Sequence, residues 1–254
     1  MANRYLRANG NWNDPVWAAT SDGTAGSAAT PTANDLVLTT GNHTLDVNTD
    51  AVCRTMYFNT GTLNLNGNSL HCVGGDFSVF YGNSSHGNVT LNLGSGTLTA
   101  RQFNIGSVPP SPYTHIINAG TSNIILSPPT SGFESYLGNY TLNDLSVNLG
   151  EGSSSSIVYK IHGTPTLRSL TVQSKNSAAH TVNFDNGASI NVDKFVAVGS
   201  SSSNRLTLKY TTEYSTPVSF NISTNGSSYG QYVAINGLSA NGSSTVPHYI
   251  RSEE

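Results

Sequence analysis

The chain has 254 residues, and only 10% of them are Asp, Glu, Lys or Arg, against roughly 25% in an average soluble domain. The net charge is -3 and the basic residues are scattered, which excludes the clustered positive charge of a nucleic-acid-binding surface. Asn, Ser, Thr and Gly fill the gap, and they suit turns and outward strand faces better than helix interiors. We therefore expect an all-β protein.

Residues 1–35 differ from the remainder of the chain and predict an N-terminal cap. They contain both tryptophans, Trp12 and Trp17, and Tyr5 adds a third ring. We expect a short irregular segment whose rings close the open end of a strand stack, because unpaired strand edges need a cover. No apolar run follows its arginines, so a signal peptide is not predicted. No apolar stretch of the chain approaches the ~20 residues that cross a bilayer, so we expect no membrane insertion.

From Leu36 to the end, residues 36–254, short alternating strands recur about every seven to ten residues, with Gly, Asn or Asp at the turns. At 62–65, for example, Leu63 and Leu65 should point to the core, and the residues between them to solvent. The expected strands lie at 36–39, 44–47, 54–58, 62–65, 70–73, 77–80, 89–93, 97–99, 145–149, 157–161, 167–172, 181–184, 195–198, 206–210, 218–222 and 232–235.

This number of strands exceeds the roughly seven to nine of a sandwich and favours a β-solenoid that resembles a right-handed β-helix. A double β-sandwich or jelly roll is the alternative, because no fixed repeat length is visible in the sequence. Cys53 and Cys72 are expected to be small buried side chains. A disulfide between them would require stacked strands, since the sequence does not place their Cα atoms.

Two proline-rich stretches, near 107–113 and 127–141, interrupt the strands and predict long loops, because central strands exclude proline. Their aromatic residues are the candidate binding residues, since exposed rings stack on sugars or fill protein pockets. The alternative is that each ring packs against its own loop. This alternative is favoured for Tyr113, and the two interpretations are weighted equally for the three residues between 133 and 140. The candidates are Tyr113, Phe133, Tyr136 and Tyr140.

No nucleotide-binding loop, nucleophile-elbow serine or His-Glu-x-x-His pattern occurs. The seven histidines and two cysteines lack metal-ligand spacing, so we expect neither a cofactor nor a metal site. The only candidate catalytic groups are Asp46 with Asp50, and Asp185 with Asp193, since glycan hydrolysis uses paired carboxylates. Both pairs lie at turns, where a structural role is favoured, and the chain is predicted not to be an enzyme.

The first forty residues carry an ordered set of short motifs: Arg4-Tyr5-Leu6, Gly10-Asn11-Trp12, Trp17, Ser21-Asp22-Gly23 and Pro31-Thr32-Ala33-Asn34-Asp35-Leu36-Val37. This order resembles the N-terminus of a family of tailed-bacteriophage virion structural proteins. Those proteins begin with Arg-Tyr-Trp and a glycine pair and enter their strand array through Pro-Thr-x-x-Asp-x-Val. The chain departs from that pattern at Leu6, where the family has Trp, and at Arg7-Ala8, where it has small residues. The resemblance implies a part of a phage particle and brings no catalytic motif.

Together these observations predict a non-enzymatic bacteriophage virion component: a tail-fibre, appendage or adhesin subunit exposed on the particle surface. The alternatives are a capsid decoration (cement) protein and a tailspike-type glycan depolymerase. The expected partners are other virion proteins, further copies of the chain, most simply in a trimer, and a host surface glycan or receptor. Such a protein would be made in the host cytoplasm and reside on the virion.

Overall fold

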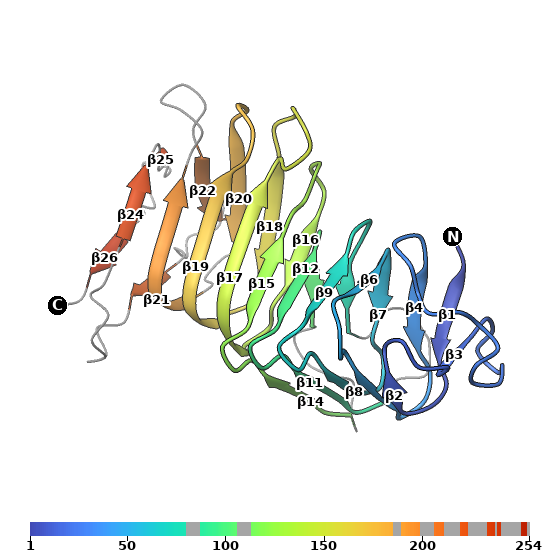
Figure 1. Ribbon diagram of the computed structural model, residues 1–254. Helices are drawn as coiled ribbons and strands as arrows, with labels where there is room; N and C mark the ends of the chain where they lie inside the picture. Colours follow the sequence, from blue (N-terminus) through green and yellow to red (C-terminus); the bar gives the residue numbers. More distant parts are fainter. Residues whose placement is uncertain are drawn as a thin grey trace. The chain divides into compact units, whose positions relative to one another are not determined.

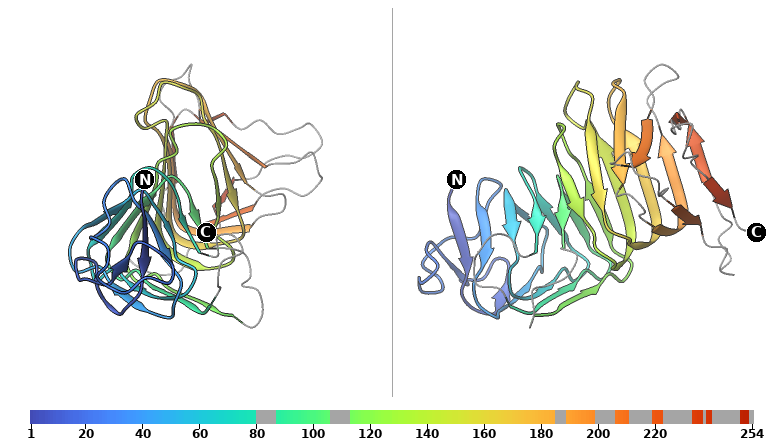
Figure 2. Two further views of the ribbon diagram at one scale, coloured as in Figure 1. Left: turned by 90° about the vertical axis from the view of Figure 1, so that its right-hand side faces the viewer. Right: turned by 180° about the vertical axis from the view of Figure 1, so that it is seen from behind.

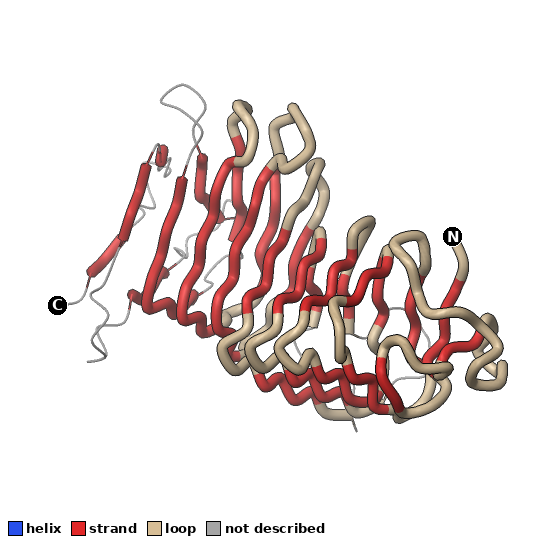
Figure 3. Tube along the Cα trace, viewed as in Figure 1, coloured by secondary structure: helices blue, strands red, loops and turns tan. Residues whose placement is uncertain are grey.

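The computed structural model describes residues 1–79, 87–105, 113–184, 189–198, 206–210, 219–222, 233–236, 238–239 and 250–252. Its strands stack in parallel from one coil to the next and form a β-solenoid (Figures 1 and 3). The predicted all-β solenoid is therefore confirmed, and the double sandwich is not the fold. The chain divides into two compact units, Met1–Ile125 and Leu126–Glu254. Within the described ranges, no helix has the length and apolar character needed to span a membrane.

The first unit contains three sheets, to which each coil adds strands. One sheet contains β3 (Trp17–Ala18), β1 (Asn3–Leu6), β4 (Leu36–Thr39), β7 (Thr55–Tyr57), β10 (Phe77–Ser78) and β13 (Phe103–Asn104). The second contains β2 (Gly10–Asn11), β5 (Thr44–Asp46), β8 (Gly61–Asn64), β11 (Val89–Asn92) and β14 (His115–Asn118). The third contains β6 (Ala51–Cys53), β9 (Ser69–Cys72) and β12 (Thr97–Ala100), and β15 (Asn123–Leu126) follows at the boundary between the units.

A row of leucines forms the core of the first unit. Leu45, Leu63 and Leu91 pair in register on β5, β8 and β11, and all three are fully buried. Burial of one such side chain stabilises the fold by about 1.5–3 kcal/mol. Leu65 is also fully buried, whereas Asn64 between the two leucines is partly exposed, as the alternation predicted.

An amide ladder runs along the outer face of the same strands. Asn64 Nδ2 donates to Asp46 Oδ1 at 2.7 Å, and Asn92 Nδ2 donates to Asn64 Oδ1 at 2.6 Å. Asn118 Nδ2 continues the ladder to Asn92 Oδ1 at 2.7 Å. Each side chain thus connects its coil to the preceding one, in addition to the backbone bonds of the sheet.

Replacing Asn92 with alanine removes two steps of this ladder. The free energy of unfolding should fall by about 1–2 kcal/mol, because one part-buried and one exposed hydrogen bond are lost and their partners remain. Urea unfolding followed by circular dichroism measures the change. Thr90→Ala, two residues earlier on the same outward face, is the control and should change stability by less than about 0.5 kcal/mol. Equal losses in the two variants would contradict a stabilising ladder.

The N-terminal segment closes one end of the first sheet. β3 pairs antiparallel with β1 and is the edge strand of that sheet among the described residues. Trp12 and Trp17 are buried, with ring centroids 5.3 Å apart at an interplanar angle of 67°, and Trp17 Nε1 donates to the Trp12 carbonyl at 2.8 Å. Tyr5 lies half-buried on β1, and its hydroxyl accepts a bond from Asn3 Nδ2 at 3.2 Å. The segment expected to be irregular therefore also supplies the first strands of two sheets, β1 and β2.

Cys53 and Cys72 lie opposite each other on β6 and β9. They form a register pair, their Sγ atoms are 3.6 Å apart, and both thiols are free and buried. The hydrogen bond to Cys53, together with burial, raises the pKa of the Cys72 thiol well above its ordinary value. The thiolate that disulfide exchange requires is therefore disfavoured in the folded chain.

Refolding with oxidised glutathione should join these cysteines. An S–S bond would form between the two cysteines while the S–S bond of the glutathione disulfide breaks. The two protons and two electrons of the cysteine thiols pass to glutathione, which is released as two reduced molecules. Because the bond would close a loop between residues 19 positions apart, we expect a gain of about 2–3 kcal/mol in unfolding free energy over the reduced protein. Thiol titration and urea unfolding measure both effects, with Cys72→Ala as control. Two titratable thiols after oxidative refolding would contradict the prediction.

His115 on β14 should make the fold sensitive to mild acid. Burial lowers its pKa to about 4, while a hydrogen bond to the Ile105 backbone acts in the opposite direction. The unfolded chain takes up a proton near pH 6.5, whereas the folded chain resists doing so until about pH 4. The stability present above pH 6.5 is therefore lost progressively as the pH falls from 6.5 toward 4.

Urea unfolding at pH 7 and pH 5 tests this dependence on His115. His115→Gln should lose less stability between the two pH values than the native chain does. His71→Gln, which changes an exposed histidine on β9, is the matched control and should keep the native dependence. An unchanged pH dependence in His115→Gln would contradict the assignment.

The second unit contains two sheets, whose successive strands lie side by side in the right-hand view of Figure 2. One contains β17 (Thr141–Leu149), β19 (Thr166–Ser174), β21 (Ser189–Val198), β23 (Ser219–Ile222) and β26 (Ile250–Ser252), and β24 (Val233–Asn236) also pairs with β21. The other contains β16 (Glu134–Tyr136), β18 (Val158–His162), β20 (His180–Phe184), β22 (Leu206–Tyr210) and β25 (Leu238–Ser239).

The strand β16 lies inside 127–141, the stretch expected to be a loop. Sequence reasoning misses it because its two-residue alternation is short and follows prolines. Of the other expected loop, residues 107–112 lie outside the described residues. The inward side chains of β17, β19 and β21 form in-register rows, for example Leu145, Leu170 and Phe195, all of them buried.

Candidate functional site

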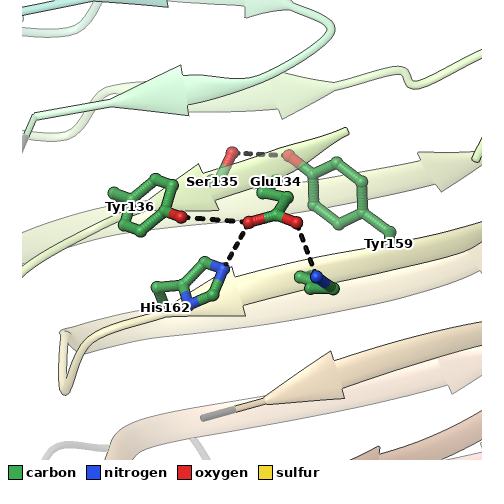
Figure 4. Close-up of polar contacts among 6 residues, drawn as sticks. Glu134, Ser135, Tyr136, Tyr159 and His162 are labelled. Carbon is green, nitrogen blue, oxygen red and sulfur yellow. Dashed lines mark hydrogen bonds and ion pairs between the residues drawn. The ribbon is translucent and has the colours of Figure 1, made fainter. Parts of the chain in front are cut away.

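The outward face of β16 and β18 gathers a carboxylate, an ammonium, an imidazole and a phenol. Glu134 pairs in register with Lys160, and Tyr136 pairs with His162. Because alternate residues of a strand point to the same side, all four side chains leave the sheet on its outer face (Figure 4). Val158 precedes Lys160 by two residues and shares this side. We call this set, Glu134, Tyr136, Val158, Lys160 and His162, the β16–β18 face.

The Glu134 carboxylate lies at the centre of the β16–β18 face. Its Oε1 accepts a hydrogen bond from Lys160 Nζ at 2.6 Å, and its Oε2 accepts one from the Tyr136 hydroxyl at 3.0 Å. His162 Nε2 lies 3.0 Å from the same Oε2. The bond from Lys160 lowers the pKa of Glu134 most, burial raises it, and the bonds from Tyr136 and His162 lower it further. The net lowering keeps this carboxyl ionised at neutral pH, which suits binding and opposes the raised pKa of a general acid.

The Tyr136 ring is exposed and yet held in place. It stacks on the His162 ring with centroids 4.1 Å apart and an interplanar angle of 5°, and its hydroxyl is fixed by Glu134. The residue is 42% exposed, and Val158 is 41% exposed. A ring held in this way loses little conformational freedom when a ligand binds, so the face is preorganised.

A buried hydroxyl pair supports the face from the inner side of the sheet. Ser135 points inward between Glu134 and Tyr136, and its hydroxyl makes a short hydrogen bond with the Tyr159 hydroxyl (Figure 4). Both residues are fully buried. Since Tyr159 belongs to β18, this bond joins the two strands beneath the outward side chains.

The predicted binding residues have different positions in the structure. Tyr136 lies on the face, and Phe133 lies half-buried just before β16, where its carbonyl accepts a bond from the Lys160 amide at 3.3 Å. Tyr140 is half-buried before β17, and burial raises its pKa. Tyr113 is half-buried in the first unit, outside the β16–β18 face.

Sequence reasoning missed Glu134, Lys160 and His162, although each carries a chemically active group. Their signal is an alternation of polar or aromatic residues, Glu134 with Tyr136 and Lys160 with His162. The two pairs meet through the stacking of one coil on the next. The sequence alone therefore does not show that the two pairs are neighbours, because the length of the coil between them must be known first.

Three of the four candidate catalytic carboxylates lie among the described residues, and two of them hydrogen-bond to neighbouring coils. Asp46 begins the amide ladder, and Asp50 Oδ1 accepts a bond from the Ser69 amide at 2.9 Å. Asp193 is exposed on β21, and Asp185 lies outside the described residues. In the part of the chain that the structure describes, no group of three or more His, Cys, Asp or Glu is placed to hold a metal ion.

Comparison of this chain with protein-family models, with curated proteins and with solved structures finds no match. A functional assignment therefore depends on the coil stack, on the N-terminal residues and on the β16–β18 face. Of these three, the β16–β18 face is the one that combines exposed apolar surface with charged groups whose partners are known.

Proposed function

We propose that this protein is a non-enzymatic structural component of a tailed-bacteriophage virion, a tail-fibre, appendage or adhesin subunit exposed on the particle surface. The observation that carries the proposal is the coil stack, in which each coil pairs in parallel and in register with its neighbours. Stacks of this kind are stabilised by contacts between adjacent coils and form stiff scaffolds suited to display.

The surface chemistry of the chain supports the same role. With only 10% charged residues, its outward strand faces present amides and hydroxyls, as in the ladder from Asp46 to Asn118. Such a surface is well solvated and carries no strong field toward nucleic acid. The expected surroundings are other virion proteins, further copies of the chain, most simply as a trimer, and a host surface glycan or receptor.

The N-terminal motifs support attachment to the particle through the cap. The Arg-Tyr, Trp and Pro-Thr-x-x-Asp-x-Val residues that resemble phage virion proteins lie in the segment that contains Trp12 and Trp17. This segment closes a sheet edge, and strand edges that are not closed pair readily with other chains. We therefore assign virion assembly to the cap and host contact to the second unit.

Immunogold labelling of intact phage with antibody against this chain tests the proposal. Gold on the tail or its appendages is the expected result. Gold confined to the head would instead identify a capsid decoration protein, and absence of gold from particles that infect normally would overturn the virion assignment. Phage lacking the gene, labelled in parallel, controls for antibody specificity.

An assay for reducing ends tests the non-enzymatic part of the proposal. The purified protein, incubated with host capsule or lipopolysaccharide, should release no reducing ends above a boiled control. Release that is abolished by Asp193→Ala or Glu134→Gln would identify a glycan depolymerase and overturn this part. Glu134 is included because it is the carboxylate of the β16–β18 face.

A further inference from the structure

The β16–β18 face exposes apolar surface that a monomeric scaffold does not need. Among the described residues of the second unit, Tyr136 and Val158 are the large hydrophobic side chains with more than a third of their surface exposed, at 42% and 41%. Both lie on one side of one strand pair, with Glu134 and Lys160 between them in register. Exposed apolar surface rimmed by polar groups is typical of a binding site.

Hydrogen-bonding groups in the middle of this surface can serve a ligand. Lys160 has three ammonium donors, and its bond to Glu134 Oε1 uses one of them. The Lys160 side chain is 40% exposed and the Glu134 side chain 28% exposed, so both are reached from solvent. A donor and an acceptor side by side suit two neighbouring hydroxyl groups, of which one accepts from the ammonium and one donates to the carboxylate.

The charge of the pair selects a neutral ligand. Glu134 and Lys160 neutralise each other at 2.6 Å, so a ligand that carries an anion would meet the carboxylate, and a cation would meet the ammonium. Either charged ligand would have to displace part of an existing ion pair, whose partner would then be left uncompensated. Hydroxyl groups can bind both charges and leave the pair intact.

The length of the face suits a ligand of more than one unit. Positions 158, 160 and 162 of β18 span about 13 Å at ~3.3 Å per residue, with apolar surface at both ends and the ion pair at the centre. A pyranose ring presents one apolar C–H face and a rim of hydroxyl groups. One ring stacked on Tyr136 would direct its hydroxyl groups toward Glu134 and Lys160, and a linked residue would lie toward Val158.

We propose that the β16–β18 face binds a neutral hexopyranose polysaccharide, with Tyr136 as the stacking ring and Glu134 and Lys160 as the hydroxyl-binding pair. The inference rests on the proposed function, since it names the receptor class that a fibre or adhesin subunit on the particle would recognise. His162 is a positioning residue, which holds the Tyr136 ring parallel to its own at 4.1 Å.

Isothermal titration calorimetry of the full chain at pH 7 tests the proposal with hexasaccharides of defined charge. The neutral probes are β-1,4-linked hexamers of glucose, mannose and galactose, and the charged probes are oligogalacturonate and N,N,N-trimethylchitosan hexamers, which keep their charge at pH 7. At least one neutral probe should bind, and both charged probes should bind more weakly than it. Failure of all three neutral probes, or tighter binding of a charged probe, would overturn the proposal.

Variants of the face then test the residue roles with the best neutral probe. Tyr136→Ala should weaken binding about tenfold, since it removes the stacking ring, whereas Tyr136→Phe keeps the ring and should stay within about threefold. Lys160→Met should weaken binding by about fivefold or more, because it removes the donor to the ligand and the ammonium that neutralises the Glu134 carboxylate. Tyr113→Ala, the same substitution in the first unit, is the matched control and should bind as the native chain does.

Circular dichroism verifies that each variant is folded, and saturation-transfer NMR on the native chain shows independently which sugar protons contact the protein: those of the apolar C–H face should receive the most saturation, and should lose it in Tyr136→Ala. Native affinity in Tyr136→Ala would overturn the proposal. Gold on the phage tail without sugar binding would overturn this inference alone. Absence of gold from the particle would overturn the proposed function, whatever the calorimetry gives.

Discussion

Replacing Trp17 with alanine should lower the free energy of unfolding by about 3–5 kcal/mol, the range for truncation of a buried large aromatic side chain. Trp17 is fully buried and packs edge-on against Trp12 at 5.3 Å. Its indole N–H also donates to the Trp12 carbonyl at 2.8 Å, so alanine leaves a buried acceptor without this donor. The cavity and the lost hydrogen bond both lower the free energy of unfolding.

Urea unfolding monitored by circular dichroism measures this loss, and two further variants separate its causes. Trp17→Phe keeps a ring and loses the N–H, so its loss of unfolding free energy should be less than half of the loss in Trp17→Ala. Tyr5→Ala changes a half-buried ring on β1 and should cost clearly less than Trp17→Ala. A loss below about 1 kcal/mol for Trp17→Ala would mean that the cap contributes little to the fold.

The alternation of leucine with polar residues predicts the strands, and their number favours the solenoid over a sandwich. The repeat length is not visible in the sequence, and the register explains why. Along the amide ladder, Asn64 follows Asp46 by 18 positions, Asn92 follows Asn64 by 28, and Asn118 follows Asn92 by 26. The turns absorb these differences outside the core, where insertions are tolerated.

The candidate site is predicted only in part, for a related reason. Tyr136 is predicted as an aromatic residue in a proline-rich stretch, but His162, the ring on which it stacks, comes from β18. Glu134 meets Lys160, and Tyr136 meets His162, through a coil-to-coil register that no motif in the sequence indicates. Cys53 and Cys72 show the same limit, since their pairing follows from the stacking of β6 on β9.

Gly61 should be among the least replaceable residues of the first unit, because its backbone and its surroundings both require glycine. Its φ is +102°, and a Cβ at this position would lie 2.2 Å from the His43 carbonyl oxygen. That oxygen accepts the hydrogen bond from the Thr62 amide at 2.9 Å, where β8 begins to pair with β5. A methyl group would therefore force apart two coils that the backbone bond holds together.

Gly61→Ala should lower the free energy of unfolding by about 3–5 kcal/mol, from about 1–2 for the left-handed backbone and the rest from overpacking against the neighbouring coil. Gly94→Ala is the matched control. Gly94 has a φ of +56°, and a Cβ added there would have no atom within 4 Å. Only the backbone penalty of about 1–2 kcal/mol therefore applies to Gly94→Ala. Urea unfolding of both variants measures the difference.

A double variant extends the same test to the amide ladder. Because Asn64 lies three residues beyond Gly61 on β8, displacement of this strand should also weaken the Asn64–Asp46 bond. Gly61→Ala and Asn64→Ala should then lose less stability together than the sum of their separate effects. Equal losses in Gly61→Ala and Gly94→Ala would show that the left-handed backbone alone demands glycine, and that the close approach of β8 to β5 does not.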